Sequence, residues 1–195
     1  MVFRCEYRQT VTDAQCWGTL LFGNSGTRAL RLSRLRGRQL ARSMTGELLS
    51  QKLLSEFAPK SSFFLDEDAD GKPFVSGSPF HISISHSGGY VAAAVADRPL
   101  GIDLQELRRI SDAVLRRCFS PAERSWIDAG DPTERAIRLW TMKEAYGKLY
   151  GRGIFSGKPF CAVFSNGRIE TEYANVTFLF QEGPEGFLFT VCLAK

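Results

Sequence analysis

The sequence predicts an α+β protein made of two similarly built halves, residues 1–97 and 98–195. In each half, helical spacing of apolar residues gives way to short extended segments, so the order helix then strands occurs twice along the chain. The composition, 44% hydrophobic and 24% charged, is that of a folded globular chain rather than a disordered one. No sequence repeat accompanies this order, so the duplication is inferred from the order of elements alone.

From the first half into the start of the second, one long helix and three strands are expected. Apolar spacing predicts the helix over about Leu35–Phe57. A polar loop follows at 65–79, where Asp-Gly, Lys-Pro and Ser-Gly pairs argue against regular structure. Strands are then predicted at 80–87, 89–96 and 99–107, separated by Gly-Gly and Asp-Arg-Pro turns. We expect them to pair in order as a meander with a buried middle strand.

The second half has two helix starts of the same kind. Ser120 and Asp131 are each followed by proline and, at the third helical position, by glutamate, a pattern typical of an N-cap. The first start follows a break after an earlier helix. The second opens a long helix that ends at Gly151 or Gly153. The remaining strands are predicted at 159–164, 170–181 and 186–195.

Charge and cysteine content indicate which partners, disulfides and metal sites the protein could have. The net charge is +4, and six arginines without an acid fall between Arg28 and Arg42. Such a cluster indicates an anionic partner (phosphate, nucleic acid or acidic protein), or else a solvated helix face. The five cysteines are scattered singly, which predicts reduced, buried thiols rather than disulfides or a zinc site. No apolar run approaches the ~20 residues of a membrane span and no signal sequence is visible, so we expect a cytoplasmic protein without membrane contact.

An acid and an amide share one face of the third predicted strand. Alternation in the sequence PLGIDLQEL places Leu100, Ile102 and Leu104 on one side and leaves Asp103 and Gln105 on the other. The two polar residues are either an ordinary wet strand edge or oxygen ligands.

The long second-half helix carries charge on an apolar stripe. Ile137 and Trp140 begin the stripe, and Glu144 and Lys148 continue it at helical spacing. A local Glu–Lys pair, worth ~0.2–0.5 kcal/mol at a surface, would explain the pairing but not its inward position. If Glu144 faces a cleft with Asp103, the two carboxylates form a hard oxygen site that suits Mg²⁺ better than zinc.

One histidine lies among serines at the end of a predicted strand, in the sequence SISHSGGY. His86 is flanked by Ser85 and Ser87, yet no nucleophile elbow and no orienting acid accompany them. Acyl hydrolysis is therefore disfavoured, and a structural polar contact or a phosphate contact is expected instead.

These segments together resemble the 4′-phosphopantetheinyl transferases of the Sfp-type branch. The motifs, in order, are GKPF at 71–74, SISHSGGYV at 83–91, GIDLQ at 101–105, FSPAE at 119–123 and LWTMKEAYGKLYGRG at 139–153. Each is weak alone, but five in order are specific, and the resemblance extends from about Arg36 to Phe160. It implies two pseudo-symmetric halves with the active site in the cleft between them. It also implies Mg²⁺-dependent transfer of the phosphopantetheine arm of coenzyme A to a carrier-protein serine, with release of 3′,5′-ADP.

The resemblance also assigns roles to residues at matching positions. Asp103, Glu144 and the neighbouring Gln105 correspond to the Mg²⁺ site. The positions that correspond to contacts with coenzyme A and its phosphates are Arg42, Lys72, Ser85, His86, Lys143 and Lys148. Glu123 corresponds to an acid proposed to deprotonate the carrier serine, and Glu144 competes for that role. Lys148, beside the pyrophosphate, would assist transfer.

Position 105 departs from the family pattern. Many members have an acid there, and an amide can still ligate Mg²⁺ or hold a ligand water at lower charge, so weaker metal binding is expected. The alternative function is a non-catalytic module that binds coenzyme A or nucleic acid. The arginine run lacks the interleaved aromatics of base stacking, so nucleic acid is not an expected partner. The expected partner is an acyl, peptidyl or aryl carrier protein, and the expected state is a monomer.

Overall fold

The computed structural model describes residues 3–11, 26–59, 63–69, 71–151 and 160–195. The chain divides into two compact units, Met1–Leu100 and Gly101–Lys195. This division lies three residues beyond the boundary drawn from the sequence. Helices and strands are both abundant, and the α+β class is confirmed. The predicted pseudo-symmetry of the halves stays a prediction.

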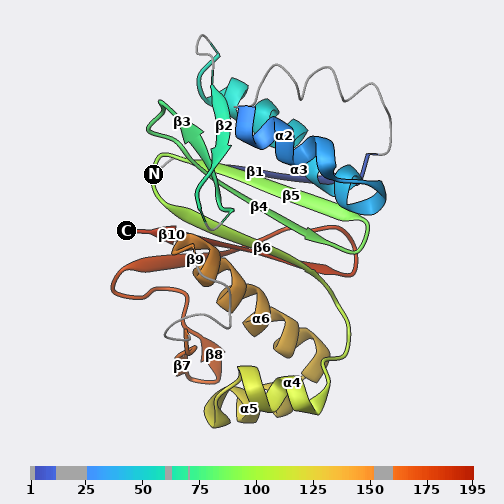
Figure 1. The fold of residues 1–195 in the computed structure, drawn as a ribbon. Coiled ribbons are helices and arrows are strands. Elements are labelled where there is room, and N and C mark those ends of the chain that lie inside the picture. Colours follow the sequence, from blue (N-terminus) through green and yellow to red (C-terminus); the bar gives the residue numbers. More distant parts are fainter. Residues whose placement is uncertain (1–2, 12–25, 60–62, 70, 152–159) are drawn as a thin grey trace. The chain divides into compact units, whose positions relative to one another are not determined.

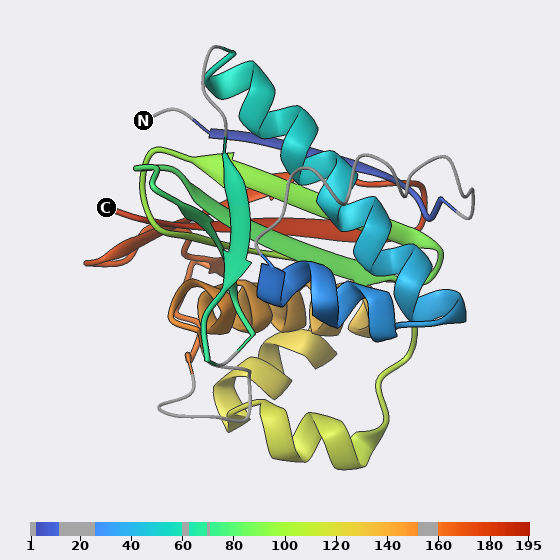
Figure 2. The same ribbon diagram turned by 45° about the horizontal axis from the view of Figure 1, so that its top comes forward.

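The first unit is built on a three-stranded sheet covered by a long helix (Figures 1 and 2). Its elements are β1 (Phe3–Gln9), α2 (Gly26–Arg34), α3 (Gly37–Phe57), β2 (Phe64–Glu67), β3 (Pro73–Ser76), β4 (His81–Ser87) and β5 (Tyr90–Ala96). The sheet has the order β1-β5-β4, and β2 and β3 form a separate hairpin. β5 lies in the middle, and its residues from Val91 to Ala96 are fully buried.

Helix α3 packs closely against the sheet because it carries a glycine at the contact. A Cβ atom on Gly46 would lie 3.0 Å from Cγ2 of Ile84 on β4. Leucines of α3, among them Leu49 and Leu53, share a core with Ile82 and Val91 of the sheet. The face of β4 that carries Ile82 and Ile84 is therefore the face that α3 covers.

The second unit contains three helices and a second three-stranded sheet of order β6-β10-β9. Its elements are β6 (Leu100–Glu106), α4 (Asp112–Cys118), α5 (Pro121–Asp128), α6 (Pro132–Leu149), β7 (Phe164–Ser165), β8 (Arg168–Ile169), β9 (Val176–Gln181) and β10 (Phe187–Ala194). Strands β9 and β10 are antiparallel, with Val191 opposite Leu179. The core lies between α6 and this sheet and includes Met142 and Phe178.

Both predicted helix starts of the second unit are confirmed. Ser120 caps α5 in a reciprocal capping box with Glu123, and Pro121 occupies the first turn. Asp131 caps α6 by accepting hydrogen bonds from the backbone N–H groups of Thr133 and Glu134. These caps satisfy N–H groups that the first turn of a helix cannot pair internally.

The elements differ from their prediction in several ways. The strands at 80–107 do not form one meander, because β1 occupies the second edge of β5 and β6 joins the other sheet. The segment 65–79 is not an irregular loop, since it holds most of the β2–β3 hairpin, in which Leu65 pairs with Val75. Helix α2 also precedes the predicted helix. Of the described residues 160–164 in the strand predicted at 159–164, only Phe164 belongs to a strand.

Two further expectations concern the cysteines and the helices. The four described cysteines are free, but only Cys192 among them is buried as expected, whereas Cys5 and Cys118 are half-buried and Cys161 is exposed. Cys16 lies outside the described residues. Within the described parts of the chain, no helix combines the length and the apolar character needed to cross a membrane.

Candidate functional site

The acid and the amide predicted to share a face of one strand are in direct contact. Nε2 of Gln105 donates a hydrogen bond of 3.0 Å to Oδ2 of Asp103 on β6. Nζ of Lys148 on α6 donates one of 2.7 Å to Oδ1 of the same carboxylate. Asp103 is buried, whereas Lys148 retains 30% of its side-chain exposure. The wet-edge interpretation of this strand is therefore wrong, because its acid is buried and paired.

Gly101 explains why β6 and α6 approach so closely. A Cβ atom at this position would lie 2.0 Å from the carbonyl oxygen of Ala145 and 2.4 Å from the backbone nitrogen of Leu149. Both are backbone atoms of the last turns of α6, so no side-chain movement could make room. Only glycine allows this backbone contact, and the contact brings Asp103, two residues along β6, within reach of Lys148.

Glu144 adds a second carboxylate to this cluster. It is half-buried, and its pKa is raised, first by burial and then by the negative charge of Asp103, while Lys148 lowers it. The electrostatic coupling to Asp103 and Lys148 indicates that Glu144 faces the same cluster. We call Asp103, Gln105, Glu144 and Lys148 the polar cluster of the second unit.

The donor set of the polar cluster fits a hard divalent cation. Asp103 and Glu144 supply carboxylate oxygens, Gln105 supplies an amide, and a cation would relieve the repulsion that raises the pKa of Glu144. Across the described residues, no group of three or more His, Cys, Asp or Glu side chains is positioned to hold a metal ion. Mg²⁺ commonly takes one or two carboxylates from a protein and completes its shell with water or substrate, which two carboxylates and an amide would suit.

Glu123 on α5 and Lys143 on α6 form a second ion pair, which is sealed from solvent. Nζ of Lys143 lies 2.8 Å from Oε1 of Glu123, and the side chains are 3% and 0% exposed. The carboxylate also accepts hydrogen bonds from the backbone N–H groups of Ser120 and Ala162, and Lys143 donates one to the carbonyl oxygen of Phe160. Sequence reasoning placed Lys143 at a pyrophosphate and Glu123 at a serine. The structure engages both in internal contacts.

In the first unit, Arg42 and His86 lie toward the same end of β4. Nη2 of Arg42 donates to the carbonyl oxygen of Gly88, which follows the strand. Alternation places the exposed His86 on the α3 side with Ile84, whereas the buried Ser85 points to the opposite face. Arg42 also lines an open pocket of about 800 Å³ together with Arg38 and the Gly88-Gly89 turn.

Lys72 lies at the other end of β4. It lines a cavity of about 370 Å³ with Asp68 and His81, the first residue of the strand. Burial lowers the pKa of Lys72, and burial together with the charge of Lys72 lowers that of His81. The five residue steps from His81 to His86 span about 17 Å along a strand. The structure therefore brings Arg42 near His86 but does not bring Lys72 to them.

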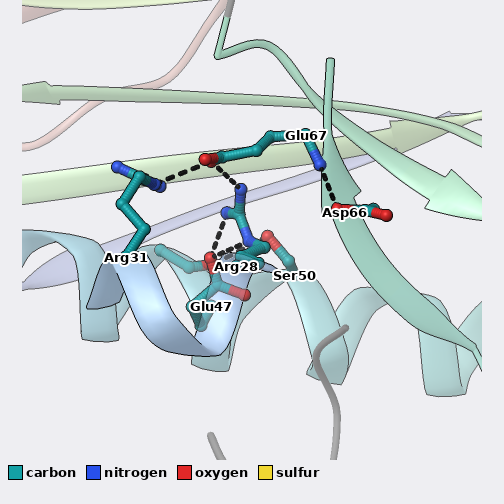
Figure 3. A network of polar contacts seen from close by, with 7 residues as sticks. Arg28, Arg31, Glu47, Ser50, Asp66 and Glu67 are labelled. Atoms are coloured by element: carbon teal, nitrogen blue, oxygen red, sulfur yellow. Dashed lines mark hydrogen bonds and ion pairs between the residues drawn. The ribbon is translucent and has the colours of Figure 1, made fainter. Parts of the chain in front are cut away.

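Part of the predicted basic patch is internal (Figure 3). Arg28 is buried, and its guanidinium binds Glu47 on α3 and Glu67 on β2, the latter at 3.2 Å. Arg31 also binds Glu67, at 2.7 Å. Sequence reasoning missed this network because Glu47 and Glu67 are distant from the arginines in sequence. Arg34, Arg36 and Arg38 are exposed, and Arg36 donates to the carbonyl oxygens of Ser33 and Leu35.

A cavity beside the polar cluster was also missed from sequence. It measures about 240 Å³ and is lined by Gln105, by Arg108 and Arg109 after β6, and by the apolar side chains of Ile137 and Trp140. The two arginines are exposed. The only signal in the sequence was the Arg-Arg pair directly after the predicted strand. Nothing in the sequence indicated that this pair lies next to the apolar stripe of the long helix.

Comparisons with known proteins converge on one family. Residues 99–189 match the family model of the 4′-phosphopantetheinyl transferase superfamily. The chain is 38% identical over 123 residues to 4′-phosphopantetheinyl transferase psf-1 of Bacillus pumilus, covering 60% of this chain and 52% of the relative. For 4′-phosphopantetheinyl transferase Sfp of Bacillus subtilis strain 168, the identity is 34% over 119 residues, covering 58% and 53%. For the transferase gsp of Aneurinibacillus migulanus, it is 32% over 119 residues, covering 58% and 50%. The chain spans about half the length of the curated relatives it matches.

Proposed function

We propose that this protein transfers the phosphopantetheine group of coenzyme A to a carrier-protein serine. The premise is that residues 99–189 belong to the 4′-phosphopantetheinyl transferase superfamily and that the relatives support the Sfp-type branch. The observation that carries the proposal is the polar cluster. Asp103, Glu144 and Lys148 converge inside the matched segment, where Asp103 is buried and paired with Lys148 at 2.7 Å. A binding module without chemistry would not need two coupled carboxylates there.

Asp103 and Glu144 are the proposed ligands of Mg²⁺, with Gln105 beside them as a weaker ligand or the holder of a ligand water. When bound, the ion would neutralise charge on the pyrophosphate of coenzyme A. Lys148 donates to Asp103 in the structure. With its remaining exposure it is placed to turn toward an anionic substrate, where its charge would stabilise the charge that develops on the leaving phosphate.

The reaction proposed for this site is a phosphoryl transfer to a hydroxyl. The serine oxygen of the carrier attacks the phosphorus that bears pantetheine, and a new oxygen–phosphorus bond forms. The bond from that phosphorus to the bridging oxygen breaks, and 3′,5′-ADP leaves with the bonding electron pair. The serine proton passes to the carboxylate of Glu144, which faces the polar cluster and is only half-buried. We assign the base to Glu144 rather than Glu123, because Glu123 is fully buried.

Residues of the first unit are the proposed contacts for the nucleotide part of coenzyme A. Arg42 and His86 lie at one end of β4, beside a pocket lined by a second arginine, Arg38. Ser85 and Lys72 remain proposed contacts to the nucleotide and its phosphates. Guanidinium and ammonium groups at separate positions suit a ligand with phosphates at separate positions.

The cavity beside Gln105 supports a protein as the acceptor. A serine that reaches the polar cluster must be presented next to this cavity, whose rim carries Arg108 and Arg109 and whose wall is apolar. The complementary surface is an acidic segment with an apolar side chain, consistent with a carrier protein.

Incubation of the protein with coenzyme A, Mg²⁺ and a panel of unmodified carrier proteins tests the proposal. We expect one carrier to gain the mass of one phosphopantetheine group and 3′,5′-ADP to appear in equal amount. The reversal Arg109→Glu should raise the KM for the carrier and leave the KM for coenzyme A unchanged. Binding of coenzyme A without mass gain on any carrier would favour a non-catalytic module that binds coenzyme A. Steeply salt-dependent binding to nucleic acid would favour a non-catalytic module that binds nucleic acid.

A further inference from the structure

The Glu123–Lys143 pair connects three parts of the second unit away from solvent. Glu123 belongs to the first turn of α5, Lys143 to the middle of α6, and the backbone groups that they bind belong to Phe160 and Ala162. Lys143 also lies 5.6 Å from the ring centre of Phe119. Every one of these partners is itself at least half-buried.

An ion pair in this position is not needed for stability alone. Taking two charges out of water costs several kcal/mol per ion, and apolar side chains of similar volume often give equal or greater stability. A buried ion pair can instead fix the orientation of the helix that carries it. Its hydrogen bonds form at one orientation of the helix, whereas apolar contacts tolerate sliding and rotation.

The direction of Lys143 determines the direction of the polar cluster on α6. Consecutive helical residues are rotated by about 100° around the axis, so fixing Lys143 toward Glu123 fixes where Glu144 points. The same helix is held against β6 by the backbone contact of Gly101 with Ala145 and Leu149. That contact sets the distance between helix and strand, whereas the hydrogen bonds of the ion pair depend on the rotation of the helix.

We propose that the Glu123–Lys143 pair is a positioning element that orients α6 so that Glu144 and Lys148 face Asp103. The proposal rests on the proposed function for the identity of the bound ion. It assigns no contact with substrate to either residue. It predicts that loss of the pair weakens Mg²⁺ binding by misaligning ligands that are themselves unchanged.

The test compares Lys143→Met with two controls at a temperature at which all variants are folded. Glu134→Gln with Arg138→Met removes an exposed ion pair of the same helix, 2.7 Å long. Leu193→Ala truncates a buried leucine of β10 and lowers stability without touching the pair. The first readout is the rise in the thermal unfolding midpoint with added Mg²⁺, without coenzyme A or carrier. The second is the Mg²⁺ concentration that gives half-maximal transfer.

We expect Lys143→Met to lower the unfolding midpoint by about 10 °C and to raise the half-saturating Mg²⁺ concentration about tenfold in both readouts. Leu193→Ala should lower the midpoint by a similar amount without changing the Mg²⁺ response, and the exposed-pair variant should change neither. The double variant Glu123→Gln with Lys143→Met leaves no lone buried charge. It should regain part of the midpoint and keep the raised Mg²⁺ requirement.

An unchanged Mg²⁺ response in folded Lys143→Met would overturn the positioning role, as would full recovery of that response in the double variant. These outcomes are distinct from failure of the proposed function. Wild-type protein that responds to Mg²⁺ but modifies no carrier would contradict the transferase activity, and the unfolding readout would still decide the positioning role. Wild-type protein without any Mg²⁺ response would overturn both.

Discussion

Two lysines of α6 make nearly the same contact in different surroundings. Lys143 lies 2.8 Å from Glu123 and Lys148 lies 2.7 Å from Asp103. The first ammonium is 3% exposed and the second 30%. The Glu123–Lys143 pair, which we call the sealed pair, binds backbone groups around it. The Asp103–Lys148 pair, which we call the open pair, adjoins the amide of Gln105 and the carboxylate of Glu144, whose pKa is raised. The contact type alone therefore does not mark a site. The polar cluster differs from the sealed pair because its two carboxylates are coupled to each other and because Glu144 and Lys148 stay partly exposed.

The largest expected effect comes from the carboxylate of the open pair. Asp103→Asn keeps the volume and one acceptor but removes the charge shared by Lys148 and the proposed ion. We expect transfer to fall by about 10³-fold or more, since several kcal/mol of charge stabilisation would be lost. Circular dichroism and the rate of carrier modification measure fold and activity on the same sample. Near-normal transfer by folded Asp103→Asn would contradict the metal assignment.

The second prediction uses a shift of α6 that should disturb the open pair and leave the sealed pair in place. In Gly101→Ala, the new methyl group would meet the carbonyl oxygen of Ala145 at 2.0 Å, so β6 and α6 must part. Misplacement of about 1 Å can cost about 10²-fold in rate, and we expect a loss of this size. The Glu123–Lys143 pair does not involve β6 and should persist. Gly186→Ala, at a turn glycine with positive φ and open space around it, is a control for the general cost of replacing glycine.

The sequence predicted the residues of the polar cluster but not their contacts, since it offered a local Glu144–Lys148 pair whereas Lys148 binds Asp103. Asp103, Glu144 and Lys148 stood out because charge interrupted an apolar pattern, which period and spacing reveal. Glu123 also followed from local chemistry, as the third residue of a capping box. Its contact with Lys143 could not be predicted in this way, because it joins two helices and a backbone segment through tertiary packing. The same limit hid the Arg28–Glu47–Glu67 network.

The strand pairings show a similar division. The existence of β4, β5 and β6 followed from alternation and turn signals, which are local. Their grouping did not, because the free edge of β5 was taken by β1, a strand more than 80 residues earlier in the chain. Competition for a sheet edge is decided by the whole sheet, and three consecutive strands with short turns do not reveal it.

The third prediction uses the raised pKa of Glu144. A carboxyl whose pKa is higher in the folded than in the unfolded state binds its proton more tightly when folded. Its contribution to stability is therefore greatest at acid pH and declines as pH rises through the raised pKa. Glu144→Gln removes this decline, so it should raise the unfolding midpoint at pH 8 relative to wild type and change it less at pH 4. Added Mg²⁺ should narrow the difference at pH 8 by stabilising the wild type.

The smallest expected effect lies at Gln105, where a charge can be added to the open pair. In Gln105→Glu, a carboxylate replaces the amide that donates to Oδ2 of Asp103 at 3.0 Å, so without metal a hydrogen bond becomes a repulsion. We expect the unfolding free energy of the metal-free protein to fall by about 1 kcal/mol.

With metal the sign should reverse, because a third carboxylate strengthens a hard oxygen site. The half-saturating Mg²⁺ concentration should fall about threefold, a change of less than 1 kcal/mol in binding. Titration of Mg²⁺ against the transfer rate and against the unfolding midpoint measures both signs in one variant. An unchanged metal dependence would mean that position 105 touches neither the ion nor its water shell. The amide would then act only by holding Asp103 toward Lys148, which would make the open pair, like the sealed one, depend on a neighbour that orients it.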